Sequence, residues 1–376
     1  MINREQLIRE FMELVQVDSE TKEESRISDT LKRKFGMLGL TCQEDDAGAK
    51  TGHAANNLFV RLPASDPLLN APKIFFTAHM DTVVPGKGIK PHLGDDGYLR
   101  SDGTTILAAD DKAGIAAMLE TVRVLQEHRL PHGDIQFIIT VGEEMVLAGS
   151  RAMDRTFIDA EFGFALDADG PVGDILIGAP ALSKVQVTFT GRTAHAGLNP
   201  EDGISAILVA SKAVSRMPLG RIDAETTANI GSFAGGSATN IVCETAELFA
   251  EARSLSEEKL ERQLQAMQEA CESAAADLGA QVKFNSTRLY PGFKFEGSDR
   301  IVRLAMKAAE RIGRRPRPQY FGGGSDANVF NGIGLPTLNL AIGYEHIHTT
   351  KERLHVDELV KTVELMLAIV QVVAEG

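Results

Sequence analysis

The sequence is poor in cysteine, in aromatic residues and in positive charge, and each shortage excludes a class of protein. Of its 376 residues only three are cysteines and none is tryptophan, while aromatic residues make up 6%. Cys42, Cys243 and Cys271 are widely spaced and share no C-x-x-C pattern, so they predict no disulfide framework and indicate a reducing compartment. The formal net charge of -13 leaves no basic face for nucleic acid or an anionic membrane.

Long apolar runs are also missing. No stretch of 18 apolar residues occurs, because Lys361 and Glu364 interrupt the most apolar segment, so no membrane-spanning helix is predicted. The first residues, Met-Ile-Asn-Arg-Glu-Gln, do not have the pattern of a signal peptide. Hydrophobic residues at 43% and charged residues at 24% are typical of a globular protein with two or three domains. We therefore expect a cytoplasmic protein.

Strand and helix patterns alternate in both the first and the last part of the chain. This order predicts an α/β fold, with a mostly parallel mixed sheet and flanking helices. Loops are expected at 63–72 and at 85–97, of which the second is rich in Gly, Pro and Asp. The expected helices are 3–16, 24–38, 113–127, 298–312 and one from Val356, and the expected strands are 57–62, 73–78, 134–141, 161–166, one around Gln319, and 336–342.

The middle of the chain follows a different pattern. Residues 183–190 alternate between apolar and polar, as a half-exposed antiparallel strand does. A helix at 203–216, strands at 228–233 and 243–253, a helix at 256–278 and a strand at 281–289 complete a β-α-β-β-α-β order, which resembles the ferredoxin-like arrangement. We therefore predict an inserted domain at 180–292, acting as a lid or in dimerisation, within a catalytic domain formed by 1–179 and 293–376.

Polar residues follow the buried strands of the predicted main sheet. His79 and Asp81 end one strand, Glu143-Glu144 and Asp167 end two others, and Asp110 opens the helix after the loop. In open α/β sheets, catalytic groups and ligands collect at such strand ends. A further histidine, His348, lies near the C-terminus.

Each of these residues has a simpler explanation when it is taken alone. A core histidine, a solvated turn, a helix cap or the acidic first turn of a helix would account for His79, Glu143-Glu144, Asp167 and Asp110 respectively. Together, however, imidazole and carboxylate groups are the ligands of a borderline divalent metal. Asp81, on the same side of an extended segment as His79, could orient its ring.

Charge favours two metal ions over one. Glu143 and Glu144 would point in opposite directions in an extended segment, so one can bind metal while the other stays free to take a proton. Asp110, Glu144 and Asp167 as ligands, with Glu143 as base, bring four negative charges into one small volume. Such carboxylates cannot all stay ionised unpaired, whereas two Zn²⁺ ions would balance them.

Five ordered motifs, H-M-D, A-D-D-K-A-G, G-E-E, L-D-A and H-T-T-K-E, resemble those of the M20 family of dinuclear zinc peptidases, and its aminotripeptidase branch above all. The resemblance spans essentially the whole chain. It implies hydrolysis of the N-terminal peptide bond of short peptides, tripeptides above all, by a water that two zinc ions activate. It also implies two overlapping ligand sets: His79, Asp110 and Asp167 for one zinc ion, and Asp110, Glu144 and His348 for the other.

The same resemblance assigns further roles. Glu143 would be the general base, the Asp110-Asp111 peptide bond would be cis, and the protein would be a homodimer. His195 in G-R-T-A-H-A-G would donate a hydrogen bond to the oxyanion, although taken alone it resembles an ordinary loop histidine.

The residues expected to bind substrate lie outside the acidic cluster. Asn240 and Arg253 resemble contacts to a substrate carboxylate, although Arg253 could instead be a solvated charge at a strand end. The run Gly322-Gly323-Gly324 lacks the pattern of a phosphate-binding loop, and we expect a substrate-side loop capped by Ser325 or Asp326. Gly322 stands where the tripeptidases have an arginine, so a contact that measures tripeptide length is missing from the motif.

Other functions remain open at this point. A deacylase or carboxypeptidase-like amidohydrolase of N-acyl amino acids would use the same metals. A peptide-binding protein without turnover would have no need of an unliganded base such as Glu143. A closed structural zinc site would favour thiolate ligands over carboxylates. The same ligands would also accept Mn²⁺ or Co²⁺.

Overall fold

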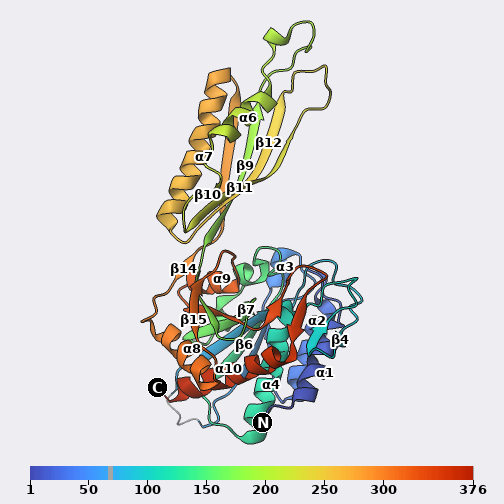
Figure 1. Ribbon diagram of the computed structural model, residues 1–376, viewed down its shortest axis with the longest axis vertical. Coiled ribbons are helices and arrows are strands. Elements are labelled where there is room, and N and C mark those ends of the chain that lie inside the picture. The colour runs from blue at the N-terminus through green and yellow to red at the C-terminus, as the bar shows by residue number, and fades with distance from the viewer. Residues whose placement is uncertain (67–70, 376) are drawn as a thin grey trace. The chain divides into compact units, whose positions relative to one another are not determined.

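The computed structural model describes residues 1–66 and 71–375, and these residues form two compact units (Figure 1). The larger unit consists of Met1–Gly178, Phe295–Phe321 and the chain from Ser325 onward, and the smaller unit of Ala179–Lys294 and Gly322–Gly324. The sequence-based division placed Gly322–Gly324 in the larger unit. In the structure these glycines contact the smaller one instead, because Gly324 lies against the Tyr290 ring and the Gly322 carbonyl accepts from Arg253 Nη1 at 3.5 Å.

The larger unit is built on a mixed sheet whose centre is parallel. Strand β3 pairs in parallel with β6 on one side and β7 on the other, and β7 pairs in parallel with β16. Strand β2 runs antiparallel to β6, β8 runs antiparallel to β16, and β15 pairs in parallel with β8. These strands are β1 (Cys42–Glu44), β2 (Leu58–Leu62), β3 (Ile74–His79), β6 (Ile135–Thr140), β7 (Phe162–Ala168), β8 (Asp174–Ala179), β15 (Arg317–Tyr320) and β16 (Thr337–Ala341).

Helices cover both faces of this sheet. The alternation of side chains along β3 sends Phe76 into the core shared with α1, α2, α4, α8 and α10, whereas Phe75 packs on the other face against Phe330 of α9. Burying one such side chain stabilises the fold by about 1.5–3 kcal/mol. The helices are α1 (Arg4–Val15), α2 (Ser25–Met37), α3 (Ala47–Thr51), α4 (Ala109–His128), α5 (Ala148–Ala152), α8 (Arg300–Arg311), α9 (Asp326–Gly332) and α10 (Val356–Ala374), with a 3-10 turn at Arg155–Phe157. The predicted α/β fold is confirmed.

A second, small sheet in the larger unit was not predicted. Its strands follow the order β17 (Tyr344–Glu345), β18 (Arg353–His355), β5 (Tyr98–Arg100) and β4 (His92–Leu93). Strand β4 lies inside the segment 85–97 that was predicted to be entirely loop. Strands of two or three residues are too short to show a period of two. The loop predicted at 63–72 includes residues 67–70, which lie outside the described residues.

The smaller unit contains an antiparallel sheet with the order β10-β11-β12-β9-β13. Helices α6 and α7 pack on one face of this sheet, where Val187, Phe189 and Leu248 are buried. Its elements are β9 (Ala181–Thr190), α6 (Ala206–Arg216), β10 (Gly220–Arg221), β11 (Thr226–Gly235), β12 (Thr245–Ser254), α7 (Glu257–Leu278), β13 (Gln281–Tyr290) and β14 (Phe293–Lys294), with a 3-10 turn at Pro200–Asp202. Without the two-residue strands β10 and β14, this is the β-α-β-β-α-β order that the sequence predicted.

In the part of the chain that the structure describes, no helix combines the length and the apolar character needed to cross a membrane.

Candidate metal centre

Polar residues gather where three parallel strands of the larger unit end. His79 is the last residue of β3, Asp167 lies near the end of β7, and Glu143 and Glu144 follow β6. Because β3 pairs in parallel with both β6 and β7, the carboxyl ends of these strands meet at one edge of the sheet. Asp110 reaches the same edge from the first turn of α4.

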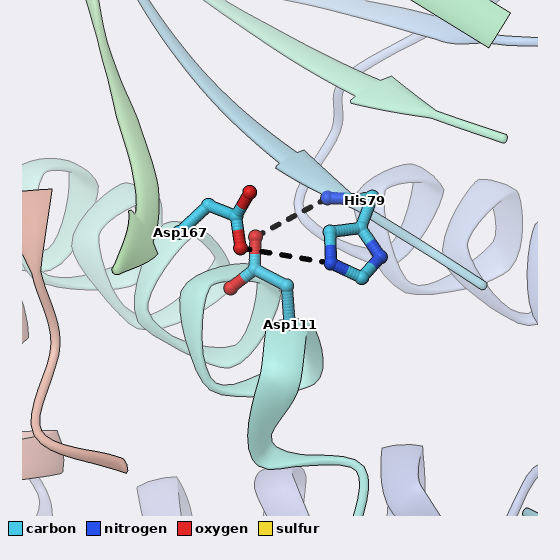
Figure 2. Close-up of side chains that lie close together, drawn as sticks. All are labelled: His79, Asp111 and Asp167. Carbon is cyan, nitrogen blue, oxygen red and sulfur yellow. Dashed lines mark hydrogen bonds and ion pairs between the residues drawn. The ribbon is translucent and has the colours of Figure 1, made fainter. Parts of the chain in front are cut away.

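The imidazole of His79 is oriented towards two carboxylates. Its Nδ1 lies 3.0 Å from the main-chain carbonyl oxygen of Asp81, which can only accept, so Nδ1 carries the hydrogen. Its Nε2 then lies 2.9 Å from Asp110 Oδ1 and 3.6 Å from Asp167 Oδ1, the second contact being visible in Figure 2. A lone pair facing two carboxylates requires a positive charge between them, either a proton or a metal ion. Burial lowers the pKa of His79, but the hydrogen bonds to Asp110 and Asp167 outweigh it and hold this pKa well above its usual value.

Asp110 lies between two histidines. Its Oδ1 faces His79, and its Oδ2 lies 3.4 Å from Nε2 of His348, which in turn lies 3.0 Å from Glu144 Oε1. Hydrogen bonds to Asp110 and Glu144 raise the pKa of His348 to about 10. Burial alone would raise the pKa of Asp110, but its hydrogen bonds to His348 and His79 lower it. One carboxylate with an imidazole at each oxygen has the arrangement needed to bridge two cations.

The backbone at Asp110 departs from a regular helix. The peptide bond between Asp110 and Asp111 is cis, which confirms that prediction. Although α4 begins at Ala109, Asp110 and Asp111 have non-helical backbone angles, so the regular helix starts close to the predicted Ala113.

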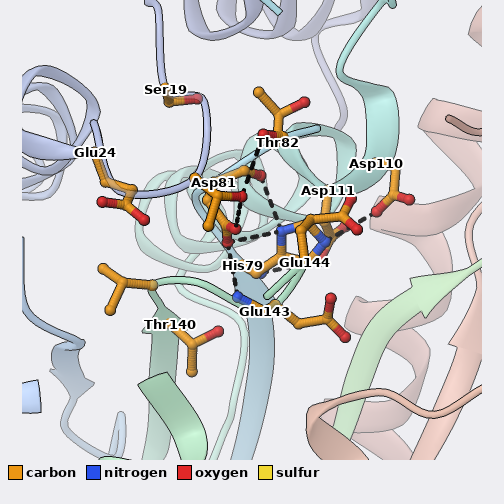
Figure 3. Close-up of polar contacts among 12 residues, drawn as sticks. Ser19, Glu24, His79, Asp81, Thr82, Asp110, Asp111, Thr140, Glu143 and Glu144 are labelled. Carbon is orange, nitrogen blue, oxygen red and sulfur yellow. Dashed lines mark hydrogen bonds and ion pairs between the residues drawn. The ribbon is translucent and has the colours of Figure 1, made fainter. Parts of the chain in front are cut away.

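Asp81 supports the site in a different way from the one predicted. The sequence suggested that its carboxylate accepts from the ring of His79, but that oxygen lies 3.4 Å from Nδ1, farther than the Asp81 carbonyl at 3.0 Å. The carboxylate instead accepts from the main-chain N–H of Glu143 at 3.0 Å and from Thr21 Oγ1 at 2.7 Å. Asp81 therefore orients His79 through its main chain and fixes the Glu143 segment through its side chain (Figure 3).

Glu143 and Glu144 differ in their surroundings. Glu144 contacts His348, whereas the Glu143 carboxylate has no hydrogen-bond partner among the described residues. Burial, followed by the negative charge of Asp167, raises the pKa of Glu143 well above its usual value. Gly142, just before it, has a φ of +59° and lies so close to His53 that a Cβ there would be 2.2 Å from Nε2. Only glycine fits this turn without moving Glu143.

The acids of the cluster need more positive charge than the protein supplies. Burial raises the pKa of Glu144 and raises that of Asp167 to about 7, which means that the site disfavours the ionised form of both acids unless positive charge is added. Possible ligand atoms of His79, Asp110 and Glu144 all lie within 4.8 Å of one another. Imidazole nitrogen and carboxylate oxygen suit Zn²⁺, Mn²⁺ or Co²⁺, and the residues therefore fit divalent ions.

Asp111 was missed as a member of the cluster. Its Oδ2 accepts from the main-chain N–H of His79 at 3.2 Å, and a second group of possible ligand atoms within 4.8 Å is formed by His79, Asp111 and Asp167 (Figure 2). Among the described residues its buried Oδ1 has no hydrogen-bond partner, and burial raises the pKa of this carboxyl well above its usual value. The only sequence feature that pointed to Asp111 was the pair of adjacent acids in D-D-K, and the sequence could not show which of the two faced the cluster.

Three more buried residues that the sequence did not single out hold the cluster in place. Tyr344 donates from its hydroxyl to Asp167 Oδ1 at 3.2 Å, and Asn339 accepts from the Asp167 N–H at 3.0 Å. Glu352, the last residue of H-T-T-K-E, accepts from main-chain amides that include that of Asp110. Their roles depend on loop conformation, which the sequence does not reveal.

Ser325 and Asp326 are buried at the start of α9. Ser325 forms a capping box with Asn328, as the sequence suggested for a cap, and Asp326 accepts from Thr140 Oγ1 and Ser150 Oγ, each at 2.5 Å. These internal bonds favour a supporting role over direct contact with a substrate. The predicted substrate contact stays a prediction.

The other predicted binding residues lie in the smaller unit. His195 is exposed, and its Nδ1 accepts from the N–H groups of Gly197 and Leu198 at 3.2 Å, while its Nε2–H has no acceptor among the described residues. The guanidinium of Arg253 pairs with Glu251, with Nε 2.8 Å from Oε1. The Asn240 side chain is exposed.

Comparison with known proteins agrees with this geometry. The model of Peptidase family M20/M25/M40 matches residues 75–372. The chain is 54% identical over 375 residues to "Uncharacterized protein YqjE" of Bacillus subtilis (strain 168), which covers 100% of both chains. Among solved structures it is similar to aminopeptidase PepT from Bacillus cereus ATCC 10987 (56% identity, TM-score 0.94, 99% of each chain) and to a tripeptidase (SAV1512) from Staphylococcus aureus subsp. aureus mu50 (45% identity, TM-score 0.97, 100% of each chain). The similarity covers both units.

Proposed function

The chain belongs to peptidase family M20/M25/M40, as its motifs predicted, and from this premise we propose that it is a metal-dependent aminopeptidase of short peptides, tripeptides above all. The solved relatives described as an aminopeptidase and a tripeptidase support this activity, since they match the whole chain at 56% and 45% identity. Because this family consists of peptidases, the alternative hypothesis of a peptide-binding protein without turnover is no longer supported.

The position of Asp110 between His79 and His348 is the observation that carries the proposal. We assign one divalent ion to His79, Asp110 and Asp167 and a second to Asp110, Glu144 and His348. The short contacts within each set support this assignment, because every histidine nitrogen involved already faces a carboxylate oxygen at 2.9–3.6 Å. Zn²⁺ is the metal we favour, and Mn²⁺ and Co²⁺ suit the same donors.

Two bound dications would supply Lewis-acid polarisation of the peptide carbonyl and lower the pKa of the attacking water. Glu143 takes a proton from that water as its oxygen adds to the carbonyl carbon. It then delivers the proton to the leaving nitrogen as the C–N bond breaks, so that an amine and a carboxylate are released. Burial, the largest cause of the raised pKa of Glu143, suits this double role, because it helps the carboxyl to accept a proton that it must later return.

His195 is our candidate for stabilising the oxyanion. The two N–H groups that donate to its Nδ1 fix the hydrogen on Nε2, and a fixed N–H donor is what a developing negative charge requires. Arg253 and Asn240 are proposed to bind the carboxylate of the substrate. Arg253 already pairs with Glu251, so a substrate carboxylate would share this guanidinium.

A panel of peptides tests the proposal. Di-, tri- and tetra-alanine, each also N-acetylated or C-amidated, would be assayed with added zinc, and release of the first residue would be followed. We expect tripeptides with a free amine to be cleaved fastest and N-acetylated peptides to resist. Hydrolysis of N-acyl amino acids without cleavage of free peptides would favour the deacylase or carboxypeptidase-like alternative instead.

We also propose a cellular compartment and an oligomeric state for the protein. The thiols of Cys42, Cys243 and Cys271 are free, which supports a reducing compartment such as the cytoplasm. The homodimer implied by the family resemblance stays a prediction, which gel filtration with light scattering would check.

A further inference from the structure

A single buried carboxylate joins the segment that carries Asp110 to the loop that carries His348. Glu352 is 2% exposed, and its Oε2 accepts from the main-chain N–H groups of Leu107 at 2.7 Å and Ala108 at 2.9 Å. Its Oε1 accepts from the N–H of Asp110 itself at 3.0 Å. Three of the four main-chain N–H groups in the 107–110 segment, those of Leu107, Ala108 and Asp110, therefore donate to one side chain.

Among the described residues, these amides have no hydrogen-bond acceptor other than Glu352. The 107–110 segment leads into the first turn of α4, where N–H groups lack partners within the helix, and Ala108 has a left-handed φ of 61°. Buried N–H groups must be paired, and a carboxylate is the side chain that can accept at several positions while donating at none. Removing the Glu352 carboxylate would leave the backbone of Asp110 free to shift.

Glu352 is also tied to the loop on the other side. Its own N–H donates to the Thr349 carbonyl at 3.1 Å, and Thr349 Oγ1 donates to the His346 carbonyl at 2.7 Å, which closes a compact turn around His348. The residue that holds the Asp110 backbone is thus fixed within the same turn as His348.

We propose that Glu352 is a positioning residue that sets the separation between Asp110 and His348 and thereby the affinity of the site for divalent ions. This inference rests on the proposed metal centre. Glu352 is not a ligand of either proposed ion, and it acts only through the backbone of residues 107–110.

Glu352→Gln tests this inference, with Glu120→Gln as its matched control. A glutamine must direct its NH₂ group at one or more of the three N–H donors, so it cannot accept all of them. Glu120 is 1% exposed and also accepts a main-chain N–H, that of Asn3 at 3.0 Å, but it touches no residue of the cluster. Zn²⁺ and Co²⁺ affinities of the metal-free proteins would be measured by calorimetry, alongside their thermal unfolding and the visible spectrum with Co²⁺.

We expect Glu352→Gln to weaken metal binding about 10- to 100-fold and to alter the Co²⁺ spectrum, as loss of a supporting group usually does. Glu120→Gln should keep the parent affinity and spectrum even if its unfolding temperature falls as much. Equal affinities in Glu352→Gln and the parent protein would overturn the inference.

Amide hydrogen exchange of the unaltered, metal-free protein gives a second test that does not depend on a variant folding. The N–H groups of Leu107, Ala108 and Asp110 should exchange as slowly as those inside α4, and rapid exchange would overturn the inference. If the amides are protected but the parent protein binds no divalent ion, the proposed function fails and the positioning role is refuted with it. If the parent protein binds metal but these amides exchange rapidly, only the role of Glu352 fails.

Discussion

Nε2 of His348 lies 3.0 Å from Oε1 of Glu144, although the two residues are 204 positions apart in the chain. This contact brings the loop after β17 to the turn after β6, and it separates Glu144 from its neighbour Glu143, which has no such partner among the described residues. Two adjacent acids therefore meet different surroundings and have different expected roles.

Replacing each of these acids by alanine should separate metal binding from catalysis. Glu143→Ala should keep the metal and lose about a thousandfold in kcat, because a general base contributes roughly 10²- to 10⁴-fold. Glu144→Ala, its matched control, should lose metal affinity instead. Metal content by mass spectrometry and steady-state kinetics on a tripeptide would measure both, and a fully active Glu143→Ala protein would refute the base assignment.

The hydrogen bond from Tyr344 to Asp167 predicts a smaller effect on metal binding. Tyr344→Phe removes a buried hydrogen bond that contributes about 1 kcal/mol, and it frees one oxygen of a proposed ligand. We expect metal affinity to fall up to about tenfold. Tyr98→Phe removes a hydroxyl–carboxylate bond of the same length, 3.2 Å, to the partly buried Glu345 and should leave the affinity unchanged. Equal effects of the two substitutions in calorimetric titrations would argue against a special role for Tyr344.

Arg253 should govern the recognition of a free C-terminal carboxylate. A hydrogen bond to a charged group contributes about 1.5–3 kcal/mol, so the parent protein should prefer a tripeptide over its C-terminal amide by roughly 10- to 100-fold in kcat/KM. In Arg253→Met this preference should disappear. Arg288→Met, which removes a guanidinium bonded to Ser183 and Glu261, should keep it. A preference that survives in Arg253→Met would assign carboxylate binding to another residue.

The buried carboxyl of Glu24 predicts a dependence of stability on pH that does not involve the metal ligands. Burial raises its pKa to about 7 from an ordinary value of 4.5, so between these values the folded protein holds a proton that the unfolded chain does not. The free energy of unfolding therefore falls as pH rises from about 4.5 to about 7 and stays lower above that.

Glu24→Gln removes this titration. At each pH the free energy of unfolding of the parent protein is subtracted from that of the variant. This difference should be roughly 1–3 kcal/mol larger at pH 8 than at pH 5, since one pKa unit corresponds to about 1.4 kcal/mol. Urea unfolding of both proteins in chelator at the two pH values would measure the change. An unchanged difference between pH 5 and pH 8 would show that Glu24 is ionised in the folded protein.

The parts of the fold that could be predicted are those with a long periodic pattern. The alternation in residues 183–190 indicated β9, and the apolar run before His79 indicated β3, because both bury side chains at a fixed spacing. The small sheet that contains β4 and β17 had no such signal, since its strands are two or three residues long.

The residues of the site also differ in whether their role could be predicted from the sequence. His79, Asp110, Glu144, Asp167 and His348 could be singled out because each carries a metal-binding group in a distinctive motif, and the structure brings all five together. The main-chain carbonyl of Asp81 and the acceptor role of Glu352 could not, because they depend on backbone conformation in loops. The burial of Ser325 and Asp326 could not be predicted either, because the sequence of a polar loop does not show which of its side chains face the core.

Tripeptide hydrolysis by the metal-stripped protein, measured as zinc is added in known equivalents, would show whether a pair of metal ions at Asp110 is required for the reaction. We expect no release of the N-terminal residue without metal and a rise that levels off at two equivalents per chain, with Asp110→Asn inactive throughout. Full activity of the metal-stripped protein, or of Asp110→Asn, would contradict this requirement.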